Sequence, residues 1–278
     1  MIIDAHVHIL PDRIRGDLAG VGAADAWFAT CHPADARVAS VESLLVTMDA
    51  QGIDRAVCLG WPFVDPALCA ESNDYLAAAQ RRFPDRIIGF GIVQPGDPGA
   101  LVELERCARL GLRGIGELNA DAQGFALTDQ ITLEPLVAAA QRCGLAWTLH
   151  CSEPVGHSYP GKGTATPGPL ATFVERNAEL TLICAHLGGG LPFYAHMPEV
   201  RELCRNLWFD TAAQPFLYAA SAYRAVIDAV GADRLLFGSD HPLLDLPRYR
   251  GALAAASLDD AEIAAILGGN AARLLDLS

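Results

Sequence analysis

The chain has 278 residues, of which 51% are hydrophobic and 19% are charged, so it can bury a large core and is not a disordered protein. Its formal net charge of −13 argues against nucleic acid and acidic membrane surfaces as partners, since either would need a basic face. The length suits a single α/β barrel.

Short apolar runs alternate with longer segments of helical period along the whole chain. The apolar runs predict eight strands, at 2–8, 55–61, 87–93, 112–118, 145–151, 181–187, 207–213 and 234–240. Segments such as VESLLVTMDAQG and LEPLVAAAQRCG place apolar residues at i, i+3, i+4 and i+7, the spacing of an amphipathic helix. Several of these segments end at a glycine, as helices often do: Gly52, Gly111 and Gly144.

Eight strands, each followed by a helix, predict one α/β domain over residues 1–278, a (β/α)8 TIM barrel. A doubly wound open sheet is the alternative, but no glycine-rich phosphate loop follows a strand. Two connections are long, at 9–40 after the first strand and at 152–167 after the fifth. Both leave the carboxyl ends of strands, where barrel active sites are built, so we expect them to surround the site.

Eight cysteines are scattered without a CxxC pair, and several lie in apolar runs such as AVCLGW and TLICAH. Thiols in such surroundings behave as small buried hydrophobic groups, so neither a disulfide framework nor a zinc knuckle is expected. The opening MIIDAH has no features of a secretory leader, and no apolar run is long enough to cross a membrane. We therefore expect a soluble cytoplasmic protein.

Six ionisable side chains end the predicted strands. They are His6 and His8 on the first strand, Glu117 on the fourth, His150 on the fifth, His186 on the sixth and Asp240 on the eighth. His6 and His8 are two residues apart, so both project from the same face of their strand. A single strand-end histidine is more often part of hydrogen-bonded structure than a ligand. Six ionisable groups at one rim are costly to bury without a cation or a catalytic task, which favours a bound metal.

Imidazole and carboxylate ligands suit Zn²⁺, Mn²⁺, Fe²⁺ and Ni²⁺. Without clustered thiolates, we expect one or two zinc ions first and manganese second. Zinc lowers the pKa of its bound water to about 7, which would supply hydroxide for attack on a substrate. Asp240 would accept the proton and return it to a leaving group, and His186 would stabilise the developing oxyanion or complete a second metal site.

The motifs DAHVH, GIGEL, LH, AHLGG, FDT and FGSDHP occur in the order seen in the metal-dependent amidohydrolase superfamily. The sequence most resembles the branch that contains aminocarboxymuconate semialdehyde decarboxylase, and the resemblance extends to the LGGNAARLL tail. It implies a distorted barrel with a divalent metal. His6, His8, His150 and Asp240 match the metal ligands of the family, and His186 matches its strand-six catalytic or metal histidine.

Hydrolases and non-oxidative decarboxylases share these ligands within the superfamily. No lysine lies near the end of the fourth strand, where Glu117 stands instead. The resemblance implies that relatives with this glutamate use it as a ligand, sometimes between two metals, and act as hydrolases. We therefore predict a hydrolase that cleaves an amide, lactone or ester bond of a small carboxylated substrate. The alternatives are a decarboxylase of an unsaturated or aromatic acid, and a barrel that keeps its metal without catalysis.

Four loop or strand-end residues are the candidate substrate contacts. The segment CSEPVGHSYPGKGTATPGP carries His157, Tyr159 and Lys162; as a lid it would offer Lys162 and His157 to a carboxylate, and otherwise it is a solvated loop. Trp61 ends the second strand and would wall the pocket, although such residues are more often packed in the core. Apolar helices such as YRAVIDAVGA could form a homo-oligomer interface or simply face the sheet.

Overall fold

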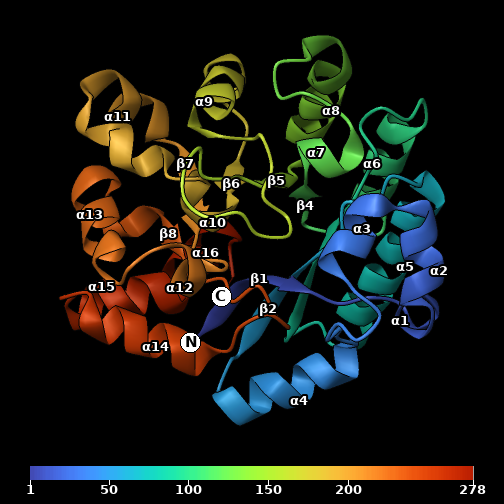
Figure 1. The fold of residues 1–278 in the computed structure, drawn as a ribbon, viewed down its shortest axis with the longest axis horizontal. Helices are drawn as coiled ribbons and strands as arrows, with labels where there is room; N and C mark the ends of the chain where they lie inside the picture. Colours follow the sequence, from blue (N-terminus) through green and yellow to red (C-terminus); the bar gives the residue numbers. More distant parts are fainter. Residues whose placement is uncertain (278) are drawn as a thin grey trace.

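Eight parallel strands follow one another in the sheet in the order of the sequence, from β1 to β8. The computed structural model describes residues 1–277. The strands are β1 (Ile3–His8), β2 (Arg55–Leu59), β3 (Ile87–Gly91), β4 (Gly114–Leu118), β5 (Ala146–Leu149), β6 (Leu182–Cys184), β7 (Leu207–Asp210) and β8 (Leu235–Leu236). The predicted (β/α)8 barrel is confirmed, and each predicted run contains one observed strand (Figure 1).

The barrel closes between its last and first strands through irregular hydrogen bonds. We call this boundary, between β1 and residues 237–241, the seam. The amide of Ala5 donates to the Phe237 carbonyl at 2.7 Å, and the amide of Asp240 donates to the His6 carbonyl at 2.9 Å. The carboxylate of Asp4 accepts from the Ser239 amide at 2.9 Å, across a sequence separation of 235 residues. The seam therefore joins the two ends of the chain.

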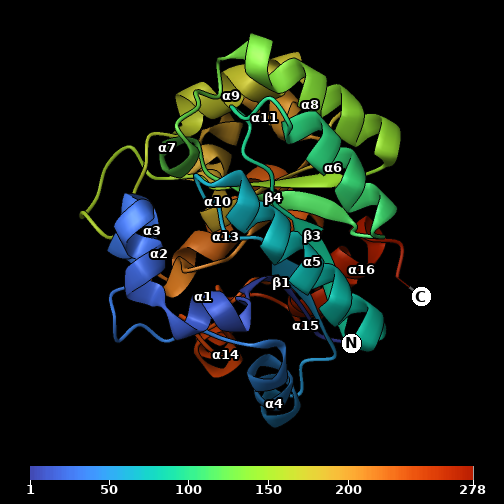
Figure 2. The same ribbon diagram turned by 90° about the vertical axis from the view of Figure 1, so that its right-hand side faces the viewer.

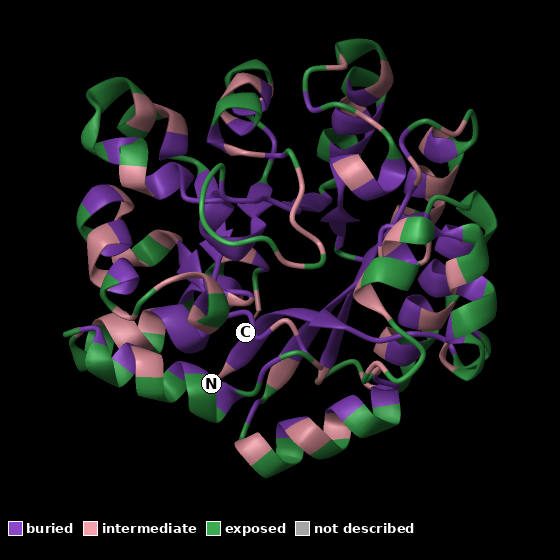
Figure 3. Cartoon of the chain, in the orientation of Figure 1, coloured by how far each residue is buried: buried purple, intermediate pink, exposed green. Residues whose placement is uncertain are grey.

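Helices cover the outside of the barrel and expose their polar faces, whereas the strands are buried (Figure 3). The longer helices are α4 (Val41–Gln51), α5 (Pro66–Arg82), α6 (Ala100–Arg109), α8 (Gln130–Cys143), α9 (Pro167–Arg176), α13 (Ser221–Val230) and α14 (Leu246–Ala255). Shorter ones are α1 (Asp12–Gly16), α2 (Leu18–Ala24), α3 (Ala26–Cys31), α7 (Ala120–Gln123), α10 (Ala185–Gly188), α11 (Pro198–Cys204), α12 (Gln214–Leu217), α15 (Asp260–Ala264) and α16 (Asn270–Leu274). Gly52 and Gly144 end α4 and α8 in the left-handed conformation, as predicted.

The two ends of the barrel differ in what covers them. At the amino-terminal end of the strands, Ala271 and Leu275 pack with Ile3, Val57 and Ile88 into one buried cluster, so the last helix plugs the barrel. At the opposite end, α3 and the loop after β5 lie beside each other (Figure 2), and residues of both line one cavity. That loop crosses in front of the barrel in Figure 1. Both long connections therefore surround the carboxyl ends of the strands.

Candidate metal centre

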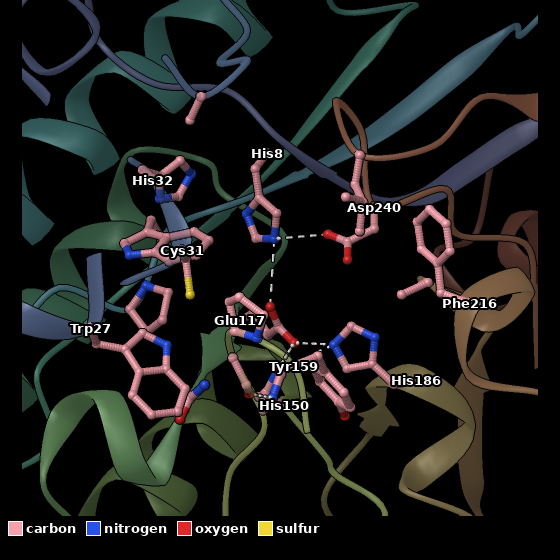
Figure 4. Close-up of a pocket in the computed structure, with 18 of the residues that line it drawn as sticks. His8, Trp27, Cys31, His32, Glu117, His150, Tyr159, His186, Phe216 and Asp240 are labelled. Atoms are coloured by element: carbon pink, nitrogen blue, oxygen red, sulfur yellow. Dashed lines mark hydrogen bonds and ion pairs between the residues drawn. The ribbon is translucent and has the colours of Figure 1, made fainter. Parts of the chain in front are cut away.

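The six predicted ligands lie together at the carboxyl ends of the strands. They form two groups of three, within each of which the ligand atoms lie within 4.8 Å of one another. The first group is His6, His8 and Asp240, and the second is Glu117, His150 and His186. Figure 4 shows the side chains of His8, Asp240, Glu117, His150 and His186 pointing toward a common space. The strands bring these residues together as the sequence predicted; that they bind a metal stays a prediction.

Glu117 lies between the two groups and faces each with a different oxygen. Its Oε2 is 3.5 Å from Nε2 of both His6 and His8. Its Oε1 is 2.8 Å from His150 Nδ1 and 3.1 Å from His186 Nε2. One carboxylate on β4 therefore links ligands from β1 with ligands that follow β5 and β6.

In each imidazole, one ring nitrogen points into the cluster and the other points away from it; we call them the inner and the outer nitrogen. Each outer nitrogen faces an oxygen atom. The pairs are His6 Nδ1 with Asp210 Oδ2 at 2.8 Å, His8 Nδ1 with the Leu59 carbonyl at 3.3 Å, His150 Nε2 with the Gly161 carbonyl at 2.9 Å, and His186 Nδ1 with the Ala212 carbonyl at 3.0 Å. Carbonyls and carboxylates only accept hydrogen bonds, so the outer nitrogens donate. In a neutral imidazole the inner nitrogen then carries a lone pair, the arrangement found in metal-binding histidines.

In this neutral form, the inner nitrogens are acceptors that face other acceptors. His6 Nε2 lies 3.2 Å from His8 Nε2, and His186 Nε2 lies 3.1 Å from His150 Nδ1. Around one ion with bonds of about 2.0–2.1 Å, neighbouring ligand atoms lie about 3.0–3.4 Å apart. Converging lone pairs at this spacing, with two carboxylates and no thiolate, fit a divalent cation.

The pKa shifts of the cluster residues also favour a cation site. Burial lowers the pKa of His6, but the carboxylates of Asp210 and Glu117 outweigh it and raise that pKa well above its ordinary value. Burial raises the pKa of Glu117, but His6 and His150 outweigh it and hold it well below its ordinary value. For His186, burial is again outweighed by Glu117, which raises the pKa to about 10. The centre therefore attracts positive charge despite its burial.

Asp210 at the end of β7 is a central residue that the sequence analysis did not single out. It is fully buried. Its Oδ2 accepts from His6 Nδ1, and its Oδ1 accepts from the backbone amides of His186 and Ala212, both at 3.0 Å. The signal was present in the FDT motif, because Asp210 ends a buried strand just as the predicted ligands do.

A cavity of about 650 Å³ opens above the centre. Trp27, Cys31 and His32 line one side and Phe216 lines another (Figure 4). The rest of its lining includes Trp61, Arg37, Asn119, Leu217 and Leu243. Arg37, Cys31 and Phe216 were not predicted, because nothing in their local sequence distinguishes a cavity wall from a surface loop.

The four predicted substrate contacts differ in their positions. Trp61, His157 and Tyr159 line the cavity. The Tyr159 hydroxyl, however, donates to Glu153 Oε2 at 2.7 Å, so this residue offers its ring to the cavity. Lys162 does not line the cavity, because its ammonium group donates to carbonyls of its own loop.

A family model described as "Amidohydrolase" matches residues 3–277. The chain belongs to this amidohydrolase family. The resemblance seen in the sequence is thereby confirmed. No helix within the described residues 1–277 combines the length and the apolar character needed to cross a membrane. The cytoplasmic location and homo-oligomeric assembly stay predictions.

Individual amidohydrolase relatives cover nearly the whole chain. A γ-resorcylate decarboxylase of Rhizobium sp. is 25% identical, with 96% of this chain and 95% of the relative covered. The crystal structure of a 5-carboxyvanillate decarboxylase from Sphingomonas paucimobilis matches with a TM-score of 0.79 at 22% identity, covering 100% of this chain and 99% of that one. A 5-carboxyvanillate decarboxylase from Novosphingobium aromaticivorans, solved with manganese and 4-hydroxy-3-methoxy-5-nitrobenzoic acid, has a TM-score of 0.80 at 20% identity, covering 100% and 96%.

These comparisons correct the predicted reaction class. The sequence analysis favoured a hydrolase because Glu117 stands at the end of the fourth strand, but the relatives that match nearly the whole chain are γ-resorcylate decarboxylases, which are lyases. A ligand set fixes where a metal sits and not which substrate bond breaks. A divalent metal is supported by the donor cluster, and zinc stays a prediction; two of the related structures hold manganese.

Proposed function

We propose that the protein is a metal-dependent, non-oxidative decarboxylase of an aromatic acid. The observation that carries this proposal is the cavity of about 650 Å³ with the six-residue cluster at its base and aromatic and apolar walls. This volume lies within the range of small-molecule sites, and walls of this kind suit a benzene ring. The decarboxylase relatives, which match nearly the full chain, supply the reaction class.

The proposed cofactor is a divalent ion, with Mn²⁺ and Zn²⁺ as the two candidates. Its ligands would be drawn from the two groups joined by Glu117, which offer places for one ion or two. When bound, the ion supplies positive charge that orients oxygen atoms of the substrate and neutralises their developing charge. Elemental analysis of wild type and Glu117→Ala counts the ions: two equivalents that fall to one or fewer in the variant indicate a bridged pair.

The cavity walls would hold the substrate ring and its carboxylate. Trp61, Tyr159 and Phe216 offer faces or edges for contact with an aromatic ring. Among the described residues that line the cavity, Arg37 is the one that carries a permanent positive charge, and it can attract an anionic substrate. His157 lies on the same rim and can contact polar ring substituents.

Decarboxylation breaks the bond between a ring carbon and the carboxylate carbon. The electron pair stays on the ring, carbon dioxide leaves, and a proton must reach the ring carbon. Asp240 would deliver it; in support, its side chain is 18% exposed, against 7–8% for His8, Glu117 and His186. Its Oδ1 lies 3.7 Å from His8 Nε2, which leaves Oδ2 to hold the proton. His186 would contact the substrate oxygens through its inner nitrogen.

The experiment is to load the stripped protein with Mn²⁺ and incubate it with γ-resorcylate (2,6-dihydroxybenzoate) and other hydroxylated benzoates. Carbon dioxide and the decarboxylated phenol are measured. We expect turnover of at least one of these acids, and a loss of about 100-fold or more in Asp240→Asn. Circular dichroism of the variant checks its fold. No carbon dioxide from any acid, with metal content verified, would show that the proposal is wrong.

A further inference from the structure

The loop after β5, residues 150–166, is fastened at its far end to α7. The backbone amide and the hydroxyl of Thr164 donate to the two carboxylate oxygens of Asp121, at 2.6 and 2.9 Å. The amide of Gly163 donates to the hydroxyl of Ser152 at 2.9 Å, which closes the base of the loop. The path of this loop is therefore set by hydrogen bonds.

The tip of the loop is folded onto itself by Lys162, which is the only lysine in the sequence. Its Nζ donates to the carbonyls of Val155 at 2.8 Å and His157 at 3.0 Å. It also lies 5.6 Å from the centre of the Tyr159 ring, within the range of a cation–π contact. An ammonium group engaged in this way organises the loop and does not point into the cavity.

The residue before Lys162 connects the loop to the metal centre. The carbonyl of Gly161 accepts from His150 Nε2 at 2.9 Å, while His150 Nδ1 faces Glu117 and His186. Gly161 has a φ of +93°, which a residue with a side chain rarely adopts. The direction of this carbonyl thus depends on the fold of the loop that Lys162 closes.

We infer that Lys162 is a positioning residue for the metal centre. By holding the tip of the loop, it keeps the Gly161 carbonyl on His150 Nε2, fixes the tautomer that turns the Nδ1 lone pair toward Glu117, and so strengthens metal binding. Loss of such outer partners typically weakens metal affinity by about 10–100-fold. The inference rests on the metal site of the proposed function and is independent of the reaction catalysed there.

The test is equilibrium dialysis of metal-stripped protein against Mn²⁺, with bound metal measured by elemental analysis. We expect the Kd of Lys162→Met to rise about tenfold, and Lys162→Arg, which keeps a donor for the two carbonyls, to restore most of the affinity. The charge-matched control is Arg142→Met, since Arg142 is exposed at the end of α8 and lies 3.7 Å from Glu105. It should bind Mn²⁺ like the wild type.

An unchanged Kd in Lys162→Met overturns the inference, as does a wild-type protein that binds no Mn²⁺. If Lys162 contacts substrate instead, its loss raises KM for γ-resorcylate and leaves the Kd unaltered. Should Lys162→Met fail to fold, Asp121→Ala releases the other end of the same loop and is expected to weaken Mn²⁺ binding in the same direction. Because dialysis uses no substrate, an absence of decarboxylation does not affect this result.

Discussion

The substitution Asp210→Asn tests whether hydrogen bonds to the outer nitrogens orient the histidines of the proposed metal site. Three N–H groups converge on Asp210: His6 Nδ1 at 2.8 Å, and the amides of His186 and Ala212 at 3.0 Å each. An asparagine of the same shape offers one oxygen and one NH₂ group. Whichever way the amide turns, its NH₂ faces at least one N–H group, so at least one of these contacts must be lost.

The size of the effect follows from which contact is lost. The amide oxygen can keep both backbone donors, and the NH₂ group then faces His6 Nδ1. His6 avoids this by moving its proton to Nε2, the nitrogen that faces His8 and Glu117. A hydrogen bond to a charged group contributes about 1.5–3 kcal/mol. This corresponds to an increase of about 10–150-fold in the metal Kd, in agreement with the usual effect of outer-shell substitutions.

The assay is equilibrium dialysis of stripped Asp210→Asn against Mn²⁺. Asp228→Asn is the matched control, because Asp228 is exposed and pairs with Arg224 on the surface of α13. We expect weaker binding in the first variant and wild-type binding in the second. A wild-type Kd in Asp210→Asn would refute the argument that Asp210 fixes the tautomer of His6.

Three further predictions concern single positions. A Cβ at Gly238 would lie 2.7 Å from the Cβ of His6, so Gly238→Ala should destabilise the fold by about 1–3 kcal/mol and lower metal content; full content with an unchanged denaturation midpoint would contradict this. Burial raises the pKa of Cys31 to about 12, so at pH 8 iodoacetamide should label the exposed Cys143 first in a mass-spectrometric time course, and equal rates would be evidence against it. Burial lowers the pKa of His32 from 6.5 to about 4, so the unfolded chain binds more protons between these values and stability should fall as the pH drops from about 6.5 toward 4. Urea denaturation of His32→Phe should show a flatter dependence in this range, and an unaltered slope would argue against a neutral His32.

The barrel could be predicted because buried parallel strands and amphipathic helices have different periodicities. The ends of the strands were less predictable. The run 181–187 predicts a strand, yet β6 ends at Cys184 and His186 lies in α10 with a left-handed φ of 56°. Asp240 likewise lies beyond β8, with a φ of 61°. The sequence remains apolar beyond the last hydrogen bonds between the strands. The backbone conformations that orient His186 and Asp240 therefore cannot be recognised from composition.

The convergence of the six candidate ligands could be predicted from residue types at strand ends, but their surroundings could not. Lys162 is a cation on a loop near the site, which suggests a substrate contact, and only the folded loop shows that backbone carbonyls occupy its ammonium group. Asp210 resembles any buried aspartate until its three donors are known. The predicted reaction class was wrong because a carboxylate such as Glu117 indicates which ions can bind. It does not indicate which bond of the substrate is broken.

The closure of the barrel at its seam has a consequence for how the protein folds. His6 and His8 come from the first strand and Asp240 from the last turn of the barrel, so this group of ligands exists only after contacts form across a separation of 235 residues. Closing so long a loop carries an entropic cost, and a ligand that binds only the closed state favours it by mass action. During synthesis, these three ligands cannot come together until residue 240 has left the ribosome. Metal binding by this group, as proposed above, would therefore mark the completion of the barrel.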